Sequence, residues 1–108
     1  MDRLETLLEF LHEDPDDPFT RFAIAQEYLK NGDFEQSVSF FEDLIRDHPD
    51  YVGTYYHLGK LYERTDRLEN AQMTYRTGIE IATSKNDAHA RAELQSALLE
   101  SEEHGFDD

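Results

Sequence analysis

Histidines and carboxylates are the side chains of this chain that could do chemistry, and no catalytic pair can be singled out among them. The chain has 5 His and 25 Asp plus Glu. No two histidines have the three- or four-residue spacing that places two metal ligands on one face of a helix. There is no cysteine, no glycine-rich phosphate loop and no Gly-x-Ser-x-Gly nucleophile motif. The sequence therefore predicts no catalytic residue, no metal site and no cofactor.

The charge of the chain is strongly acidic, with 25 acidic residues against 10 basic ones and a formal net charge of −15. Such a field repels phosphate backbones, so we expect neither nucleic acid nor an anionic membrane surface as a partner. Seven of the basic residues are Arg and three are Lys. Two interpretations stay open: a protein of a salt-accumulating (halophilic) organism, or an ordinary acidic surface that aids solubility.

Helices must position any binding side chains, because apolar residues recur at helical spacing along the chain. The pattern predicts about six helices, over roughly residues 2–13, 18–31, 33–48, 52–65, 68–85 and 88–103. No stretch alternates apolar and polar residues as a strand would, so the predicted fold class is all-α. The last eight residues, 101–108, are predicted to form a frayed tail.

No apolar run approaches the ~18–20 residues that a membrane-spanning helix needs. The first ten residues are acidic and amphipathic, unlike a signal peptide. We therefore expect a cytoplasmic protein.

Turn and cap residues separate the predicted helices. Asp17 precedes Pro18 and is expected to cap the second helix. Gly32 can take the left-handed conformation that ends this helix, and Asp33 resembles the start of a capping box for the next. Asp66 resembles the start of a second capping box.

The chain repeats itself with a period of 34 residues. The residues Ile24, Ala25, Tyr28, Phe34, Ser37, Phe41 and Ile45 recur as Leu58, Gly59, Tyr62, Leu68, Ala71, Tyr75 and Ile79. A unit of this size cannot bury its apolar face alone, so it must stack on a copy of itself. Stacked units leave a curved surface whose usual use is to hold another protein.

These residues resemble the tetratricopeptide repeat. The second copy matches through Tyr55, Leu58, Gly59, Tyr62, Leu68, Ala71, Tyr75 and Gly78, and the first through Ile24, Ala25, Tyr28, Gly32, Phe34, Phe41 and Pro49. Leu7, Leu11 and Pro15 fall in frame as half of an earlier unit.

The resemblance implies a right-handed α-solenoid of antiparallel helix pairs forming a single domain over residues 1–108. Its parts would be an N-terminal half-repeat (1–17), two repeats (18–51 and 52–85) and a C-terminal capping helix (86–104). Small residues such as Gly59 and Ala71 would let the two helices of a unit approach closely, and a bulky replacement would overpack that contact. Arg21 occupies a position that is apolar in the family, so its stem should pack while its head reaches water. Asp66 occupies the position of the family's turn glycine, which requires a left-handed backbone.

The resemblance also implies which residues face a bound peptide, since the first helix of each repeat lines the concave groove. The candidate partner-binding residues are Phe22, Gln26, Lys30, Tyr56, Lys60, Arg64 and Arg91. Their basic members would suit a partner that is acidic or ends in a carboxylate. Two alternatives remain: that Phe22 and Tyr56 simply pack in the core, and that pairs such as Asp87 with Arg91 and Lys60 with Glu63 are ordinary surface contacts.

Some members of the family hold chaperone tails with a two-carboxylate clamp. Of the five positions that it needs, held here by Phe22, Gln26, His57, Asp87 and Arg91, only Arg91 matches. Chaperone-tail binding is therefore not expected.

The predicted function is a non-catalytic scaffold that binds a protein or peptide in the groove of its repeats. A self-associating module is the alternative, and a small enzyme is the more distant one. We expect a monomer or a weak homodimer.

Overall fold

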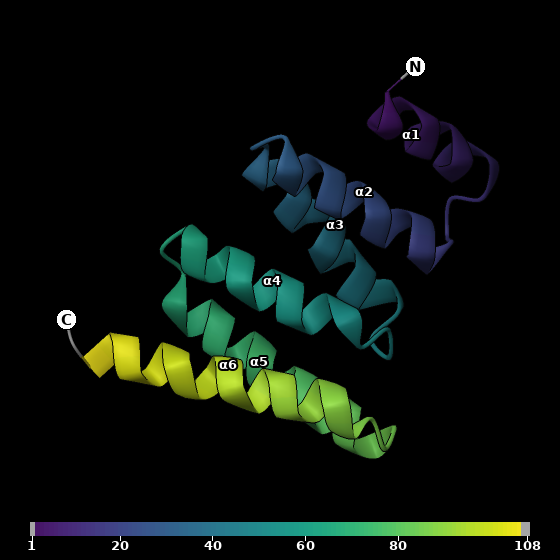
Figure 1. Ribbon diagram of the computed structural model, residues 1–108. Coiled ribbons are helices and arrows are strands. Elements are labelled where there is room, and N and C mark those ends of the chain that lie inside the picture. Colours follow the sequence, from purple (N-terminus) through teal and green to yellow (C-terminus); the bar gives the residue numbers. More distant parts are fainter. Residues whose placement is uncertain (1, 107–108) are drawn as a thin grey trace. The chain divides into compact units, whose positions relative to one another are not determined.

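The computed structural model describes residues 2–106 and consists, over that range, of six α-helices without a strand (Figure 1). Their bounds are α1 Arg3–Glu13, α2 Pro18–Lys30, α3 Phe34–Asp47, α4 Gly53–Arg64, α5 Leu68–Ser84 and α6 Ala88–Phe106. The predicted all-α class and the number of helices are confirmed. Within the described range, every helix is too short or too polar to cross a membrane.

The predicted frayed tail is wrong for residues 101–106, because α6 continues to Phe106. Ser101 is fully buried, and its hydroxyl donates to the Leu98 carbonyl oxygen at 2.7 Å. Arg76 of α5 also lies 3.5 Å from the Glu102 carboxylate. The Arg76–Glu102 contact joins this part of α6 to α5. Residues 107–108 lie outside the described range.

The helices form two compact units that divide between Tyr51 and Val52. In unit 1, α2 packs against both α1 and α3. In unit 2, each of α4, α5 and α6 packs against the other two. The division into repeats at residues 18–51 and 52–85, within one domain, stays a prediction.

Unit 1 is held by a close contact between α2 and α3. Ala25 and Ser37 are fully buried, and the Ser37 hydroxyl donates to the Ala25 carbonyl oxygen at 2.8 Å. Such a direct bond between a side chain and the facing backbone needs small residues on both helices. Ile24, Phe41 and Leu44 are also fully buried in this core.

In unit 2, glycine residues allow α4 and α5 to approach closely. A side-chain carbon added to Gly59 of α4 would overlap the Tyr75 ring of α5. One added to Gly78 of α5 would lie 2.6 Å from Cβ of Tyr55, closer than real atoms approach. The expected close approach at Gly59 is therefore present in the structure.

Four aspartates cap helices with hydrogen bonds from backbone N–H groups. Asp2, Asp17, Asp33 and Asp87 accept from the third residue after each, at 2.8, 3.2, 3.4 and 3.1 Å respectively. This satisfies donors that the first turn of a helix leaves without a partner. The caps predicted at Asp17 and Asp33 are confirmed.

The capping box predicted at Asp66 is wrong. Asp66 has a φ of 60°, and the residue at the cap position of α5 is Arg67, whose side chain makes no capping hydrogen bond. Gly32 has a φ of 82° immediately before the capping Asp33. Asp66 is therefore the counterpart of Gly32, one residue too early to cap α5, and the left-handed backbone expected there is confirmed.

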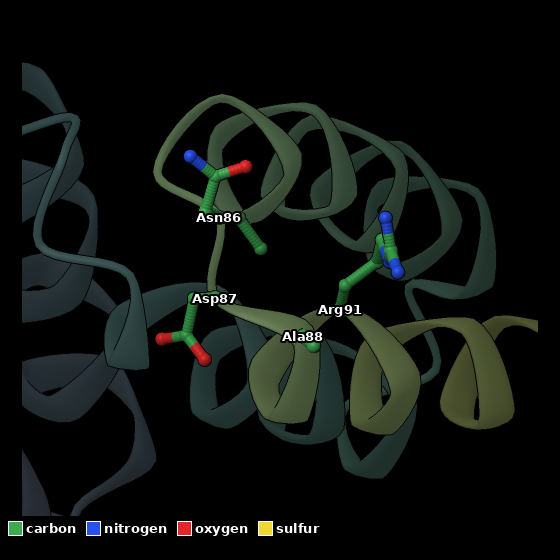
Figure 2. Close-up of a pocket in the computed structure, with 5 residues that line it drawn as sticks. Asn86, Asp87, Ala88 and Arg91 are labelled. Atoms are coloured by element: carbon green, nitrogen blue, oxygen red, sulfur yellow. The ribbon is translucent and has the colours of Figure 1, made fainter.

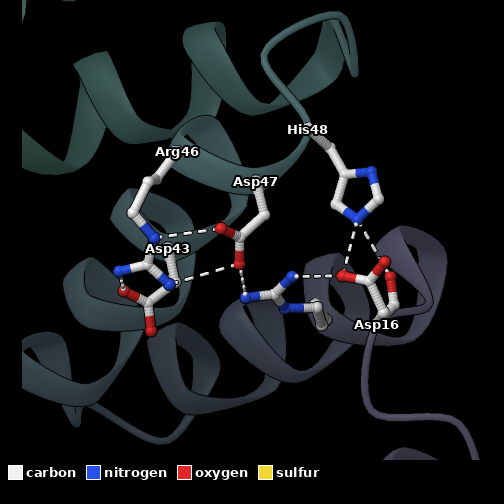
Figure 3. A network of polar contacts seen from close by, with 6 residues as sticks. Asp16, Asp43, Arg46, Asp47 and His48 are labelled. Atoms are coloured by element: carbon white, nitrogen blue, oxygen red, sulfur yellow. Dashed lines mark hydrogen bonds and ion pairs between the residues drawn. The ribbon is translucent and has the colours of Figure 1, made fainter.

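The head of Arg21 does not reach water as expected. Its guanidinium lies 2.8 Å from the Asp47 carboxylate and 3.4 Å from that of Asp16, and the side chain is 10% exposed (Figure 3). His48 Nε2 lies 3.1 Å from the same Asp16 carboxylate. The guanidinium is thus solvated by two carboxylates, Asp16 from the loop before α2 and Asp47 from the end of α3, in place of water. Hydrogen bonds from Arg46 and Arg21 hold the pKa of Asp47 well below its usual range.

Candidate partner-binding surface

The candidates of unit 1 share one face of α2. Phe22, Gln26 and Lys30 are spaced four residues apart, so they lie one above another along the helix. Phe22 is half-buried, and its ring centroid lies 5.7 Å from those of Phe41 and Tyr51. Gln26 and Lys30 are exposed. Phe22 therefore packs in part against the core and presents the rest of its ring beside two exposed polar side chains.

Lys30 has a weak ionic partner on its own helix. Its Nζ lies 4.0 Å from the Glu27 carboxylate, and the lysine side chain is 76% exposed. Glu27 also receives the guanidinium of Arg3 of α1 at 3.3 Å. Because Glu27 has two cations beside it and Lys30 is solvated, the ammonium group can turn toward a ligand at little cost.

The candidates of unit 2 centre on Lys60 of α4. Its Nζ lies 5.7 Å from the centroid of the Tyr56 ring, 3.9 Å from the Glu63 carboxylate and 3.8 Å from that of Glu100 in α6. The Lys60–Glu63 surface pair, an alternative in the sequence, is thus present. The two carboxylates offset the positive charge of Lys60, so this part of the surface is less positive than the sequence implies.

Glu63 connects this cluster to the core. Its carboxylate accepts a hydrogen bond from the hydroxyl of Tyr75, a fully buried residue of α5. Burial, helped by the bond to Glu63, raises the pKa of Tyr75 far above its usual range. Tyr75 therefore remains a hydrogen-bond donor to Glu63 at any ordinary pH.

The sequence did not predict that Glu100 lies beside Lys60 or that His57 lies beside Tyr56. Glu93 and Glu100 are seven residues apart, so they share a face of α6, and the field of Glu93 reaches His57 of α4. Burial lowers the pKa of His57, and its ring lies 5.6 Å from that of Tyr56. The seven-residue spacing of the two glutamates was the available signal for an acidic row facing α4.

Arg91 lies apart from the Lys60 cluster. It is nine residues before Glu100 on α6, a separation of roughly 13 Å along the helix. It lines a pocket of about 100 Å³ with Ala82, Asn86, Asp87 and Ala88 (Figure 2). The Asp87–Arg91 pair considered from the sequence is not formed: the Asp87 carboxylate accepts a hydrogen bond from the Ala90 backbone N–H. Within the described residues, no carboxylate forms an ion pair with Arg91.

Arg64 is exposed on α4, one turn beyond Lys60. Phe22, Gln26 and Lys30 therefore belong together on one helix, as do Tyr56, Lys60 and Arg64 on another, while Arg91 stands on a third. Among residues 2–106, no group of three or more His, Asp or Glu side chains is arranged to hold a metal ion. The side chains present can bind by aromatic, ionic and hydrogen-bond contacts.

Comparison with known proteins identifies the family to which this fold belongs. The family model of the tetratricopeptide repeat matches residues 20–46 and 52–85, more than half of the chain. The chain belongs to the tetratricopeptide repeat family, and the resemblance inferred from its motifs is confirmed. No curated protein matches it.

Among solved structures, the chain is similar to a tetratricopeptide repeat domain protein from Salinibacter ruber. The two share 53% identity over 82% of this chain and 90% of the other, with a TM-score of 0.80. The TPR2B domain of yeast Sti1, solved in a complex with pHsp70, is 14% identical over 94% of this chain and 81% of the other (TM-score 0.86). PcrH, solved with the chaperone-binding region of PopD, is 11% identical over 94% and 77% (TM-score 0.86). These distant likenesses confirm the helical solenoid fold class.

Proposed function

We propose that this protein is a non-catalytic scaffold that binds protein or peptide segments through two like surfaces, one on α2 within unit 1 and one on α4 within unit 2. One observation carries the proposal: the same three positions of both repeats hold an aromatic residue followed by two polar ones. The first repeat has Phe22, Gln26 and Lys30 at these positions, and the second has Tyr56, Lys60 and Arg64, each 34 residues later. In each case the aromatic side chain is half-buried, and the polar side chains reach solvent. Aromatic residues are enriched at protein interfaces, where polar residues form the surrounding rim.

Proteins of the same fold support a binding role. The TPR2B domain of Sti1 is found in complex with pHsp70, and PcrH with a region of PopD. Both of these proteins are found in a complex with part of another protein, which supports the same kind of role for this chain.

The partner that we propose is acidic or ends in a carboxylate. Arg64 and Arg91 are exposed cations, and Lys30 has only a distant carboxylate beside it. Lys60 would have to exchange Glu100 or Glu63 for the ligand. Little area is available on so few helices, so we expect micromolar affinity.

The experiment is affinity capture from the native cell extract with the wild type and two double variants. Tyr56→Ala with Lys60→Ala should lose the captured partner and remain folded by circular dichroism. The matched control, Met73→Ala with Arg76→Ala, changes one exposed apolar and one exposed basic residue of α5 and should keep it. Unchanged capture by the first variant would contradict the assignment of α4. Once the partner is known, a peptide with an amidated C-terminus tests the carboxylate directly.

We further propose a cytoplasmic protein, monomeric or weakly dimeric, adapted to a high-salt interior. A net charge of −15 on 108 residues makes copies repel one another and favours hydration by dense carboxylates. Sedimentation at several concentrations measures the oligomeric state, and a tight dimer at low salt would contradict this assignment.

A further inference from the structure

Helix α1 has one packed face and one open face. It packs on α2 through Leu7, which is 7% exposed, with Leu4 and Leu11 partly buried beside it. Phe10 of the same helix is 51% exposed. An exposed phenylalanine beside a packed leucine row shows that the apolar surface of α1 extends beyond its contact with α2.

The repeat frame indicates what belongs on the open face. Counting one period of 34 residues from Phe10 leads to Leu44, and two periods lead to Gly78. Leu44 is fully buried, and Gly78 is buried against Tyr55 of α4 and Leu94 of α6. Helix α5, which carries Gly78, is covered by a helix on each of two sides, α4 and α6. The equivalent position in α1 therefore lies where a helix packs in the later copy.

The charge beside Phe10 narrows the kind of helix that fits. Glu5, Glu9 and Glu13 form a row along α1 at four-residue spacing, and all three are exposed. Within the described residues no cation pairs with this row, and Arg3 is turned to Glu27 of α2. A second copy of the chain would bring a like row of carboxylates against this one, which is unfavourable.

We propose that the open face of α1, formed by Phe10 with Glu9 and Glu13, docks an amphipathic helix of a partner protein that carries an aliphatic stripe edged by Lys or Arg. The docked helix takes the place that α4 takes beside α5. In the same frame, the residue of the docked helix that lies opposite Phe10 is the counterpart of Tyr55, which packs on Gly78. Because Phe10 is bulky where Gly78 has no side chain, that residue has to be small. This surface is separate from the face of α2 that carries Phe22, so the inference does not depend on the proposed function.

Two synthetic helical peptides of equal length test the proposal, each with the same alanine and leucine stripe, one edged by lysines and one by glutamates. Binding to the full chain is measured at low salt by calorimetry, with NMR locating the perturbed residues. The lysine peptide should bind at micromolar concentration, perturb α1 and bind at least 10-fold more tightly than the glutamate peptide. Phe10→Asp should weaken its binding at least 10-fold. The matched control, Leu99→Asp on the exposed surface of α6, should leave it unchanged.

Both substituted side chains are exposed, so circular dichroism should show folded variants. Failure of the lysine peptide to bind, equal binding of the two peptides, or wild-type binding by Phe10→Asp would overturn the proposal. A concentration-dependent dimer that Phe10→Asp abolishes would also overturn it, because a second copy would then be the occupant. Retained peptide binding by the Tyr56→Ala, Lys60→Ala variant separates this surface from the proposed groove.

Discussion

Units 1 and 2 share one repeat frame, yet they hold their helices together with different chemistry. Arg21 and Asp47 form an ion pair in unit 1, and the equivalent positions in unit 2 are held by Tyr55 and Ile81. Unit 1 brings Ala25 against Ser37, whereas unit 2 uses glycine against tyrosine. The period thus fixes where two helices meet, and the side chains at the meeting point can be charged, small or aromatic.

The two units also differ in charge. Residues 1–51 carry fourteen acidic and four basic residues, a net of −10, and residues 52–108 carry eleven and six, a net of −5. Repulsion between carboxylates should therefore weigh more on unit 1. The difference gives each unit its own sensitivities, which variants and conditions can separate.

The largest effect is expected at the glycine–tyrosine contact of unit 2. Gly59→Ala should lower the free energy of unfolding by about 1–3 kcal/mol, because the new methyl group overlaps the buried Tyr75 ring. Adding Tyr75→Phe recreates the Ala25 and Phe41 combination of unit 1 and frees the ring from Glu63. The double variant should recover part of the loss in urea unfolding. Strictly additive costs would show that the two units do not share this packing rule.

The second largest change in stability is expected when the ion pair of unit 1 is replaced by the apolar residues found at the same positions of unit 2. Asp47→Ile should lower the urea midpoint, because it leaves the buried guanidinium of Arg21 with only Asp16. Arg21→Tyr with Asp47→Ile should restore the midpoint or raise it, since well-packed apolar residues often replace a buried ion pair without loss. A double variant less stable than Asp47→Ile would mean that the pair is required in unit 1.

The turn before α5 should be improved by the residues of the turn before α3. Asp66→Gly with Arg67→Asp should raise the stability of unit 2 by about 1 kcal/mol, because glycine tolerates a left-handed backbone and aspartate caps the helix. Part of the gain is offset, since Arg67 stacks over the Tyr62 ring at 4.8 Å. Thermal unfolding measures the change, with Gly32→Asp as the matched, destabilising exchange in unit 1. Equal midpoints for all three proteins would contradict the role of these turns.

Salt should stabilise unit 1 more than unit 2. Raising the salt from low to molar concentration screens carboxylate repulsion, so hydrogen-exchange protection should rise further for α1–α3 than for α4–α6. Stability that stays flat or falls would contradict the high-salt interpretation of the composition.

The smallest effect is a response of unit 2 to mild acid. Burial lowers the pKa of His57 below the ordinary ~6.5, so the unfolded chain binds more protons and stability falls as the pH drops below about 6.5. In unit 1 the depressed pKa of Asp47 keeps its carboxylate charged, and its contribution is lost only as the pH falls below about 4. Hydrogen exchange, corrected for intrinsic rates, should show unit 2 losing protection first. His57→Gln should remove that difference, and a response that survives this change must come from another group.

Most of the fold could be predicted from the sequence, because helical periodicity and the 34-residue period are local and regular signals. The errors arose where two local rules competed or where a distant residue decided the outcome. The sequence around Asp66 fits both a helix cap and a left-handed turn residue. The structure decides between them, since α5 begins one residue later than a cap at Asp66 requires. Arg21 finds its partner Asp47 twenty-six residues away. The chain likewise gives no local sign that Glu100 reaches Lys60, so the charge of the candidate surface was overestimated.

The hydrogen bond from Tyr75 to Glu63 has a consequence for how tightly a ligand can bind. Glu63 is anchored to a core residue, and it lies 3.9 Å from Lys60 Nζ, which a second carboxylate and the Tyr56 ring also restrain. Folding thus restrains the lysine side chain. A partner that bound here in place of Glu100, with the Lys60–Glu63 contact kept, would not have to immobilise a freely rotating side chain, a saving of about 0.5–1.5 kcal/mol in rotamer entropy.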